Sequence, residues 1–190
     1  MRVRSGLRHA SKPSPQSRRV LGIDPGTVHT GWGVIEMVGG SLLHLAHGTI
    51  SSSGSEEQAR RLKRIYHGLQ EVLKLYEPQE ISLEKVFLAR NAQSALKLGQ
   101  ARGIALLAAA ENDMTIQEYA SAEIKLAVVG YGQATKEQVQ QMVGSLLGLS
   151  ERISRDAADA LAAAICNLHQ QTFHARVVRS LSATRQEVPH

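Results

Sequence analysis

The stretch from Val20 to Glu36, VLGIDPGTVHTGWGVIE, constrains the fold of this chain more than any other. Val20, Leu21 and Ile23 are typical of a buried β-strand, and the strand ends on Asp24. Because an unpaired buried carboxylate is costly, Asp24 must be protonated, hydrogen-bonded within the Pro-Gly turn, or neutralised by a cation. An Asp-Pro pair is also a common start of a type I turn, so the motif alone leaves these explanations open.

The hydrophobic pattern of the whole chain predicts an α/β fold. After the first strand, a second strand and the Gly39-Gly40 turn lead into a third, which together make an antiparallel meander. Two later strands are expected to join this meander as parallel strands, which gives a five-stranded mixed sheet flanked by helices. The predicted strands cover residues 20–24, 29–36, 41–51, 81–84 and 114–119, and the predicted helices cover 62–76, 91–111, 121–128, 135–147 and the region from about 154 onward.

The length of 190 residues and a hydrophobic content of 43% allow one core and one domain. The net charge of +5 comes from the first 19 residues, which hold six Lys and Arg and no acid. We therefore expect a disordered basic arm at 1–18, a folded domain at 19–173 and a tail at 174–190. The arm could attract phosphates without sequence preference, or only raise solubility.

Apolar runs and cysteine content indicate the cellular compartment of the protein. No apolar run approaches the ~20 residues that span a bilayer, and the first residues lack the apolar core of a secretory signal. Cys166 is the single cysteine, which excludes an intramolecular disulfide and agrees with a reducing compartment. We therefore expect a soluble, cytoplasmic protein with no membrane partner.

Three further acids lie where this fold could bring them to Asp24. Glu84 ends its predicted strand in the same way, and Asp156 and Asp159 share one face of the last helix. Acids in a first helical turn also have an ordinary explanation, since they favour the positive end of the helix dipole. Four converging carboxylates suit Mg²⁺ or Mn²⁺, and two such ions ~4 Å apart support phosphodiester hydrolysis.

Other catalytic arrangements are missing from the sequence, which has no H-x-x-x-H, G-x-S-x-G or G-x-x-x-x-G-K-[ST] pattern. The helix at 91–111 instead carries a stripe of small residues. Ala92, Ala95, Gly99 and Gly103 would let another backbone approach closely, either from the same chain or from a second copy.

Five segments together resemble the RuvC family of Holliday-junction resolvases, in order and spacing, over about residues 20–170. They read GIDPGTVHTGWGV, LEKVF, SALKLGQARG, VVGYGQATKEQVQ and DAADALAAAI. The resemblance implies a ribonuclease-H-like fold and a homodimer that makes paired, Mg²⁺-dependent nicks in four-way DNA junctions during homologous recombination and DNA repair. It places the family's catalytic and metal-binding acids on Asp24, Glu84, Asp156 and Asp159, with two Mg²⁺ ions per site, and it implies the RuvA and RuvB branch-migration proteins as partners.

The resemblance also suggests DNA-binding residues. Phe87 matches an aromatic side chain that stacks on a junction base, although a core position would explain it equally well. Lys125 and Lys136 match lysines near the active site that could hold the scissile phosphate, and Lys136 opposes the dipole preference of a helix start. Lys85 could bind DNA or screen the metal site. Arg90, Lys97 and Arg102 could contact phosphates, with solvated surface as the default explanation for each.

Other functions fit the residues less well. A related ribonuclease-H-like enzyme that processes RNA shares the GIDPG start, but SALKLGQARG and the Phe87 loop argue against it. A non-catalytic dimer that binds branched DNA would gain by losing four acids that repel phosphate. An actin-like ATPase needs a duplicated domain, for which this chain is too short.

Overall fold

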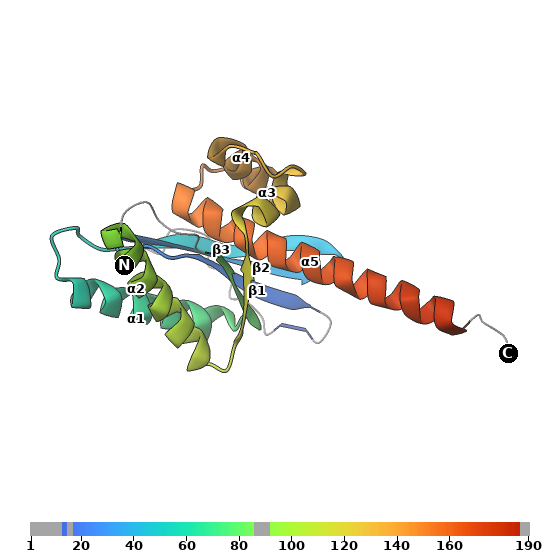
Figure 1. The fold of residues 1–190 in the computed structure, drawn as a ribbon, viewed down its shortest axis with the longest axis horizontal. Helices are drawn as coiled ribbons and strands as arrows, with labels where there is room; N and C mark the ends of the chain where they lie inside the picture. Colours follow the sequence, from blue (N-terminus) through green and yellow to red (C-terminus); the bar gives the residue numbers. More distant parts are fainter. Residues whose placement is uncertain (1–12, 15–16, 86–91, 187–190) are drawn as a thin grey trace.

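The computed structural model describes residues 13–14, 17–85 and 92–186. Within them a five-stranded mixed sheet lies between two layers of helices (Figure 1). The elements are β1 (Arg18–Asp24), β2 (His29–Val38), β3 (Ser41–Ser51), α1 (Gln58–Tyr76), β4 (Glu80–Glu84), α2 (Ala92–Ala110), β5 (Thr115–Tyr119), α3 (Ser121–Val129), α4 (Lys136–Leu146) and α5 (Arg155–Gln186).

The strand order β3-β2-β1-β4-β5 puts β1 at the centre of the sheet. Strands β1, β2 and β3 pair antiparallel, whereas β4 pairs parallel to β1 and β5 parallel to β4. The predicted α/β class and mixed sheet are therefore confirmed. Strand β1 begins at Arg18, the last residue of the expected basic arm, and α5 continues to Gln186, past residue 173.

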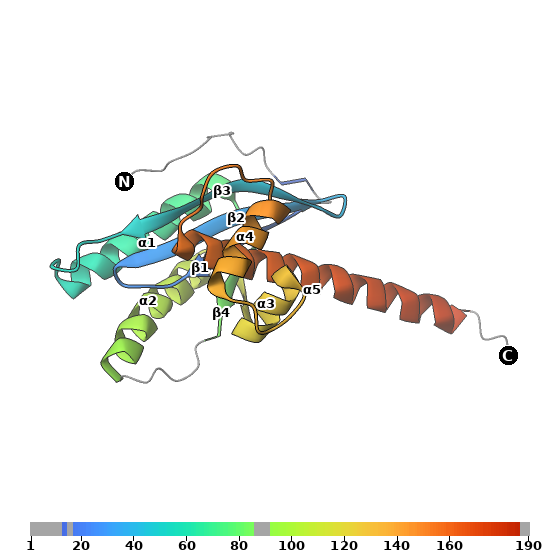
Figure 2. The same ribbon diagram turned by 90° about the horizontal axis from the view of Figure 1, so that it is seen from above.

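Each face of the sheet has its own apolar core. On one face, α1 and α2 cover side chains such as Leu21, Ile23 and Leu83. On the other face, α3, α4 and α5 enclose a core that contains Val20, Ile35 and the alanines of α5. Figure 2 shows α5 running across the sheet, with α3 and α4 on the same side. Cys166 lies in this second core with no exposed surface, as expected for an inert packing residue.

Helix α5 lies directly on the sheet because the strands beneath it carry glycine. A β-carbon added to Gly22 would come within 1.8 Å of the Ala160 carbonyl oxygen, and one added to Gly33 would meet Leu161 at 2.4 Å. The alanines of α5 supply the matching slim surface, and those from Ala162 to Ala164 are buried. The G-x-G spacing of β2 thus lets helix and sheet backbones approach more closely than larger side chains would allow.

The start of β1 carries a buried ion pair. Arg19 is 2% exposed, and its guanidinium contacts the Glu36 carboxylate at 3.1 Å and the carbonyl oxygen of Tyr76. The Ser17 hydroxyl donates to the same carboxylate. These contacts join β1, β2 and the end of α1. Removal of either charged partner would leave the other charge buried and uncompensated, which is strongly destabilising.

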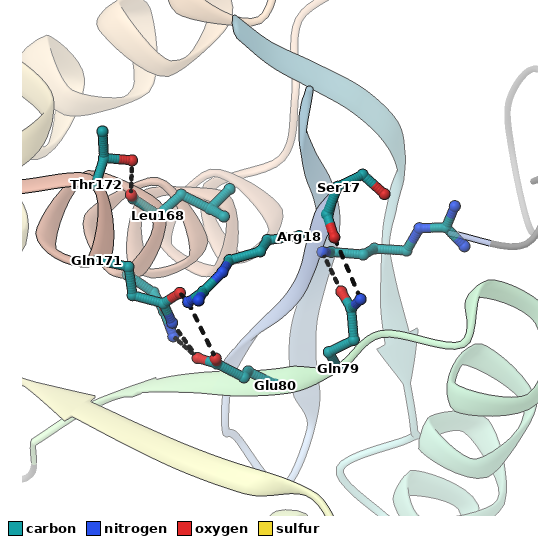
Figure 3. Close-up of polar contacts among 9 residues, drawn as sticks. Ser17, Arg18, Gln79, Glu80, Leu168, Gln171 and Thr172 are labelled. Carbon is teal, nitrogen blue, oxygen red and sulfur yellow. Dashed lines mark hydrogen bonds and ion pairs between the residues drawn. The ribbon is translucent and has the colours of Figure 1, made fainter. Parts of the chain in front are cut away.

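A polar network fastens α5 to the opposite end of the sheet from Asp24 (Figure 3). Gln171 accepts from the Arg18 guanidinium and donates to Glu80 at the start of β4. Asn167 also donates to Glu80, at 3.2 Å. Beyond this network α5 extends away from the sheet (Figure 1), where Phe173 is 63% exposed. In the described part of the chain, no helix is long and apolar enough to cross a membrane.

Candidate active site

Two of the predicted acids leave the sheet at the same edge. Strands β1 and β4 are parallel neighbours with Ile23 opposite Leu83, so Asp24 and Glu84 occupy corresponding positions at their carboxyl ends. The carboxyl ends of adjacent parallel strands form the usual binding edge of an α/β sheet. Both side chains are partly buried, so packing restrains them while they remain accessible to a ligand.

The other two acids reach this edge on the first turns of α5. Asp156 sits directly over Gly31, where an added β-carbon would come within 2.0 Å of the Asp156 carbonyl oxygen. Gly31 is the partner of Asp24 across the β1–β2 pair. The absence of a side chain at Gly31 therefore lets α5 bring Asp156, and Asp159 one turn later, beside Asp24.

The other three acids disfavour the charged form of Asp24. Burial, followed by the charges of Asp159 and Asp156, raises the pKa of Asp24 from 3.8 to about 7, with a smaller contribution from Glu84. The positive charge of the Lys136 ammonium lowers the pKa of Asp24. It contacts Asp159, with Nζ 3.1 Å from Oδ2, and this carboxylate raises the pKa of Lys136 in turn.

The raised pKa of Asp24 predicts a pH-dependent stability. Because the folded-state pKa lies above that of the unfolded chain, folding retains a proton that the unfolded chain releases, and the free energy of unfolding falls as pH rises from about 4 to about 7. Asp24→Asn removes the ionisable group and with it the loss of stability at high pH. We expect its melting temperature without divalent cations to exceed that of the wild type more at pH 8 than at pH 4.5, measured by thermal unfolding. An equal difference at both pH values would contradict this account.

A cavity of about 110 Å³ lies between the acids and two lysines. Its lining includes Glu84, Asp159, Lys125 and Lys136, with Ser121 at the start of α3. Larger cavities of about 650 and 840 Å³ lie along α1 and contain none of the predicted site residues. We take the small cavity as the chemical site, because it is the one of these three cavities that predicted site residues line.

The remaining predicted residues lie in different places. Lys85 is exposed immediately after β4, and its backbone N–H donates to the Tyr119 carbonyl at 2.8 Å. Lys97 is exposed on α2. Phe87 and Arg90 lie outside the described residues.

Sequence reasoning missed the role of Arg102. Its guanidinium donates to the backbone carbonyl of Glu84 at 2.9 Å and pairs with Glu118 on β5. With only 15% of its side chain exposed, Arg102 fixes the end of β4 rather than offering a charge to phosphate. Eighteen residues separate Arg102 from Glu84, and no sequence pattern links them.

The donor set suits hard divalent cations. All four acids offer oxygen ligands, and a cation would offset both the burial and the neighbouring negative charges that raise the pKa of Asp24. Within the described residues no three Asp, Glu, His or Cys side chains already converge as ligands of one ion. Mg²⁺ does not need such a cage, because it keeps several waters and usually takes one or two carboxylates together with substrate phosphates.

The fold and the site together indicate the class of protein to which this chain belongs. A mixed five-stranded sheet with acids at the ends of its central and neighbouring strands, and on a helix that crosses it, is typical of ribonuclease-H-like nucleases. The family model described as "Crossover junction endodeoxyribonuclease RuvC" matches residues 20–167. The chain therefore belongs to the RuvC family of crossover junction endodeoxyribonucleases, as its sequence motifs predict.

Individual relatives agree with this assignment. The RuvC endonuclease of Geobacter sulfurreducens is 51% identical over 163 residues, covering 86% of this chain and 99% of that protein. Thermus thermophilus RuvC, solved in complex with a Holliday junction substrate, has a TM-score of 0.78 at 34% identity and covers 83% of this chain and 96% of its own. The yeast mitochondrial Holliday junction resolvase Ydc2 has a TM-score of 0.62 at 12% identity, covers 94% of this chain and 87% of its own, and supports the fold alone.

Proposed function

We propose that this endonuclease resolves four-way DNA junctions by paired, symmetric nicks during homologous recombination and DNA repair. The observation that carries the proposal is the group of four acids around Asp24, in a chain of the RuvC family. The Thermus thermophilus relative, solved with a Holliday junction substrate, supports this choice of DNA. We further propose that residues 19–173 form the nuclease domain, and that RuvA and RuvB act with it.

In this mechanism Asp24, Glu84, Asp156 and Asp159 would hold two Mg²⁺ ions, for which Mn²⁺ can substitute. When bound, the ions supply an activated water and stabilise the leaving 3′-oxygen of phosphodiester hydrolysis. The protein contributes a fixed set of oxygens on rigid elements, since two acids end strands of the sheet and two lie on α5. This arrangement keeps the carboxylates together in spite of their repulsion.

The lysines of the cavity orient the phosphate. Lys125 and Lys136 approach the acids from α3 and α4, so their ammonium groups can contact the scissile phosphate opposite the carboxylates. Lys136 is paired with Asp159 without substrate, and 71% of its side chain remains exposed. Its ammonium can therefore shift toward a phosphate that enters the cavity. We assign Phe87 to base stacking at the junction and Lys85 and Arg90 to backbone contacts.

The experiment compares three labelled substrates: a four-way junction, the corresponding duplex and a structured RNA. Each is incubated with Mg²⁺ and, separately, with a chelator. We expect symmetric nicks in the junction alone, and only with the metal. Trimming of the RNA would support the related RNA-processing activity instead, and junction binding without any cleavage would point to a non-catalytic binder.

We also propose a homodimer formed through α2. The buried face of this helix packs through alanines such as Ala101 and Ala105, whereas Gly99 and Gly103 are exposed, with open space around them among the described residues. Leu96 is 64% exposed and Leu107 is 48% exposed on the same helix. Among the described residues, no other part of the chain packs on Gly99 and Gly103, which favours the second of the two partners considered from the sequence, a twin subunit.

The double variant Leu96→Glu, Leu107→Glu is expected to be monomeric at micromolar concentration, because a charge buried in an apolar interface costs more than the contact gains. Light scattering measures the mass. Leu126→Glu is a matched control, since Leu126 is 57% exposed on α3, away from the proposed interface. A double variant with the same mass as a dimeric wild type, or a wild type that is itself monomeric, would rule out this interface.

A further inference from the structure

Asp24 belongs to a row of residues that crosses three strands. Gly31 on β2 is its partner across the β1–β2 pair, and Thr49 on β3 is the partner of Gly31 across the next pair. Asp24, Gly31 and Thr49 therefore lie side by side, from the centre of the sheet to the strand at its edge. None of the roles assigned above uses Thr49.

The chain entering α5 passes over the same row. The Asp156 carbonyl lies against Gly31, as described above, and the Ser154 hydroxyl lies 3.1 Å from the Thr49 hydroxyl. The start of the helix is thus seated on β2 at Gly31 and tied to β3 at Thr49. From these two points it presents Asp156 toward Asp24 on β1.

Ser154 links Thr49 to the helix itself. Its side-chain oxygen accepts from the backbone N–H of Ala157 at 3.3 Å, and its carbonyl accepts from that of Ala158 at 2.9 Å, so Ser154 caps α5. A hydroxyl that accepts from a backbone N–H can still donate its own hydrogen. The Thr49 oxygen is placed to receive it, which fixes the rotamer of the capping side chain.

A separate anchor fixes the position of the entering chain. Ile153 is 5% exposed in the core, and the Gln140 side chain donates to its carbonyl at 2.6 Å. This anchor locates the chain just before the helix, from the side of α4. The Thr49–Ser154 contact adds a restraint from β3, two residues before Asp156.

We propose that Thr49 is a positioning residue, which acts through Ser154 to hold Asp156 in the orientation that metal binding needs. The inference rests on the proposed function, because it takes Asp156 as a metal ligand. Thr49 and Ser154 form their contact at the exposed rim of the molecule, so it adds little to global stability. Its effect is local, on the geometry of one carboxylate.

The test compares Thr49→Val, which keeps the shape and removes the hydroxyl, with Thr49→Ser, which keeps the hydroxyl. The first measurement is Mn²⁺ binding to the free protein, followed by electron paramagnetic resonance. We expect Thr49→Val to weaken binding by about 10-fold, the lower range for loss of a group that orients a metal ligand, and Thr49→Ser to bind like the wild type. Amide hydrogen exchange at Ala157 and Ala158 should accelerate in Thr49→Val alone.

Cleavage provides a second measurement. The Mg²⁺ concentration for half-maximal junction cleavage should rise in Thr49→Val, while the rate at saturating Mg²⁺ and the melting temperature stay near the wild-type values. A role in stability alone would lower the melting temperature and leave the metal dependence unchanged. Wild-type Mn²⁺ affinity together with wild-type amide exchange in Thr49→Val would overturn the inference.

Asp156→Asn in the same assays separates this inference from the proposed function. If Asp156→Asn cleaves junctions and binds Mn²⁺ like the wild type, Asp156 is not a ligand and both proposals fail. If Asp156→Asn loses both properties and Thr49→Val keeps both, the site is correctly assigned and only the role of Thr49 is rejected.

Discussion

Replacing either Asp24 or Asp159 by Asn is expected to abolish junction cleavage and to leave junction binding close to that of the wild type. Each change keeps the size of the side chain and removes a charged ligand. Loss of a group that merely supports a metal ligand costs about 10–100-fold, so loss of a ligand itself should exceed about 100-fold. Binding should persist because repulsion between carboxylates and phosphates falls when a negative charge is removed.

Cleavage rates with saturating Mg²⁺ and gel-shift affinities measured in Ca²⁺ check the two halves of this expectation. Asp113→Asn is the matched control, because Asp113 is an exposed aspartate in the turn between α2 and β5. Its left-handed backbone, with φ 51°, suits Asn as well as Asp. Wild-type cleavage by Asp24→Asn or Asp159→Asn would reject the proposed metal site.

Gly31→Ala should reduce both stability and cleavage. The new β-carbon would lie 2.0 Å from the Asp156 carbonyl oxygen and 2.9 Å from the Asp156 β-carbon, so the start of α5 must move away from the sheet. Overpacking of this kind typically costs about 1–3 kcal/mol of the free energy of unfolding. The shift also carries Asp156 away from Asp24, so we expect a loss of cleavage at temperatures where the variant remains folded.

Urea unfolding and single-turnover cleavage measure these two effects. Gly54→Ala is the control, because among the described residues nothing lies within 4 Å of its added β-carbon. If Gly31→Ala matched Gly54→Ala in both measurements, α5 would not be seated on Gly31 as the structure has it.

Much of the fold could be predicted because its signals are local. The predicted third strand has the observed bounds, Ser41–Ser51, and the Thr135 cap opens α4, with the Gln138 N–H donating to the Thr135 hydroxyl at 3.3 Å. Hydrophobic periodicity and caps depend only on neighbours in sequence. The two acids that end strands were also visible, because a charge at the end of an apolar run is unusual.

Contacts between distant elements could not be predicted. Arg19 reads as one of the basic charges near the start of the chain, yet it is buried against Glu36. Arg102 reads as solvated surface, yet it holds the carbonyl of Glu84. Both roles depend on which side chains the folded sheet brings together, and no local pattern encodes that.

The sequence pattern did not predict where α5 ends. The family resemblance ends near residue 170, and the sequence predicts a domain end at residue 173. No Gly or Pro interrupts the chain between Arg155 and Gln186, so nothing local stops the helix where its apolar packing ends. The end of the apolar pattern marked the end of packing, not the end of the helix.

The burial of Cys166 gives this protein an internal probe. As the single thiol of the chain, it is fully enclosed on α5, and burial raises its pKa to about 12. Thiol reagents attack the thiolate, so modification must wait until the helix separates from the sheet. The rate of labelling therefore reports how often the element that bears Asp156 and Asp159 detaches, and a bound junction that clamps this helix would slow that rate without any engineered tag.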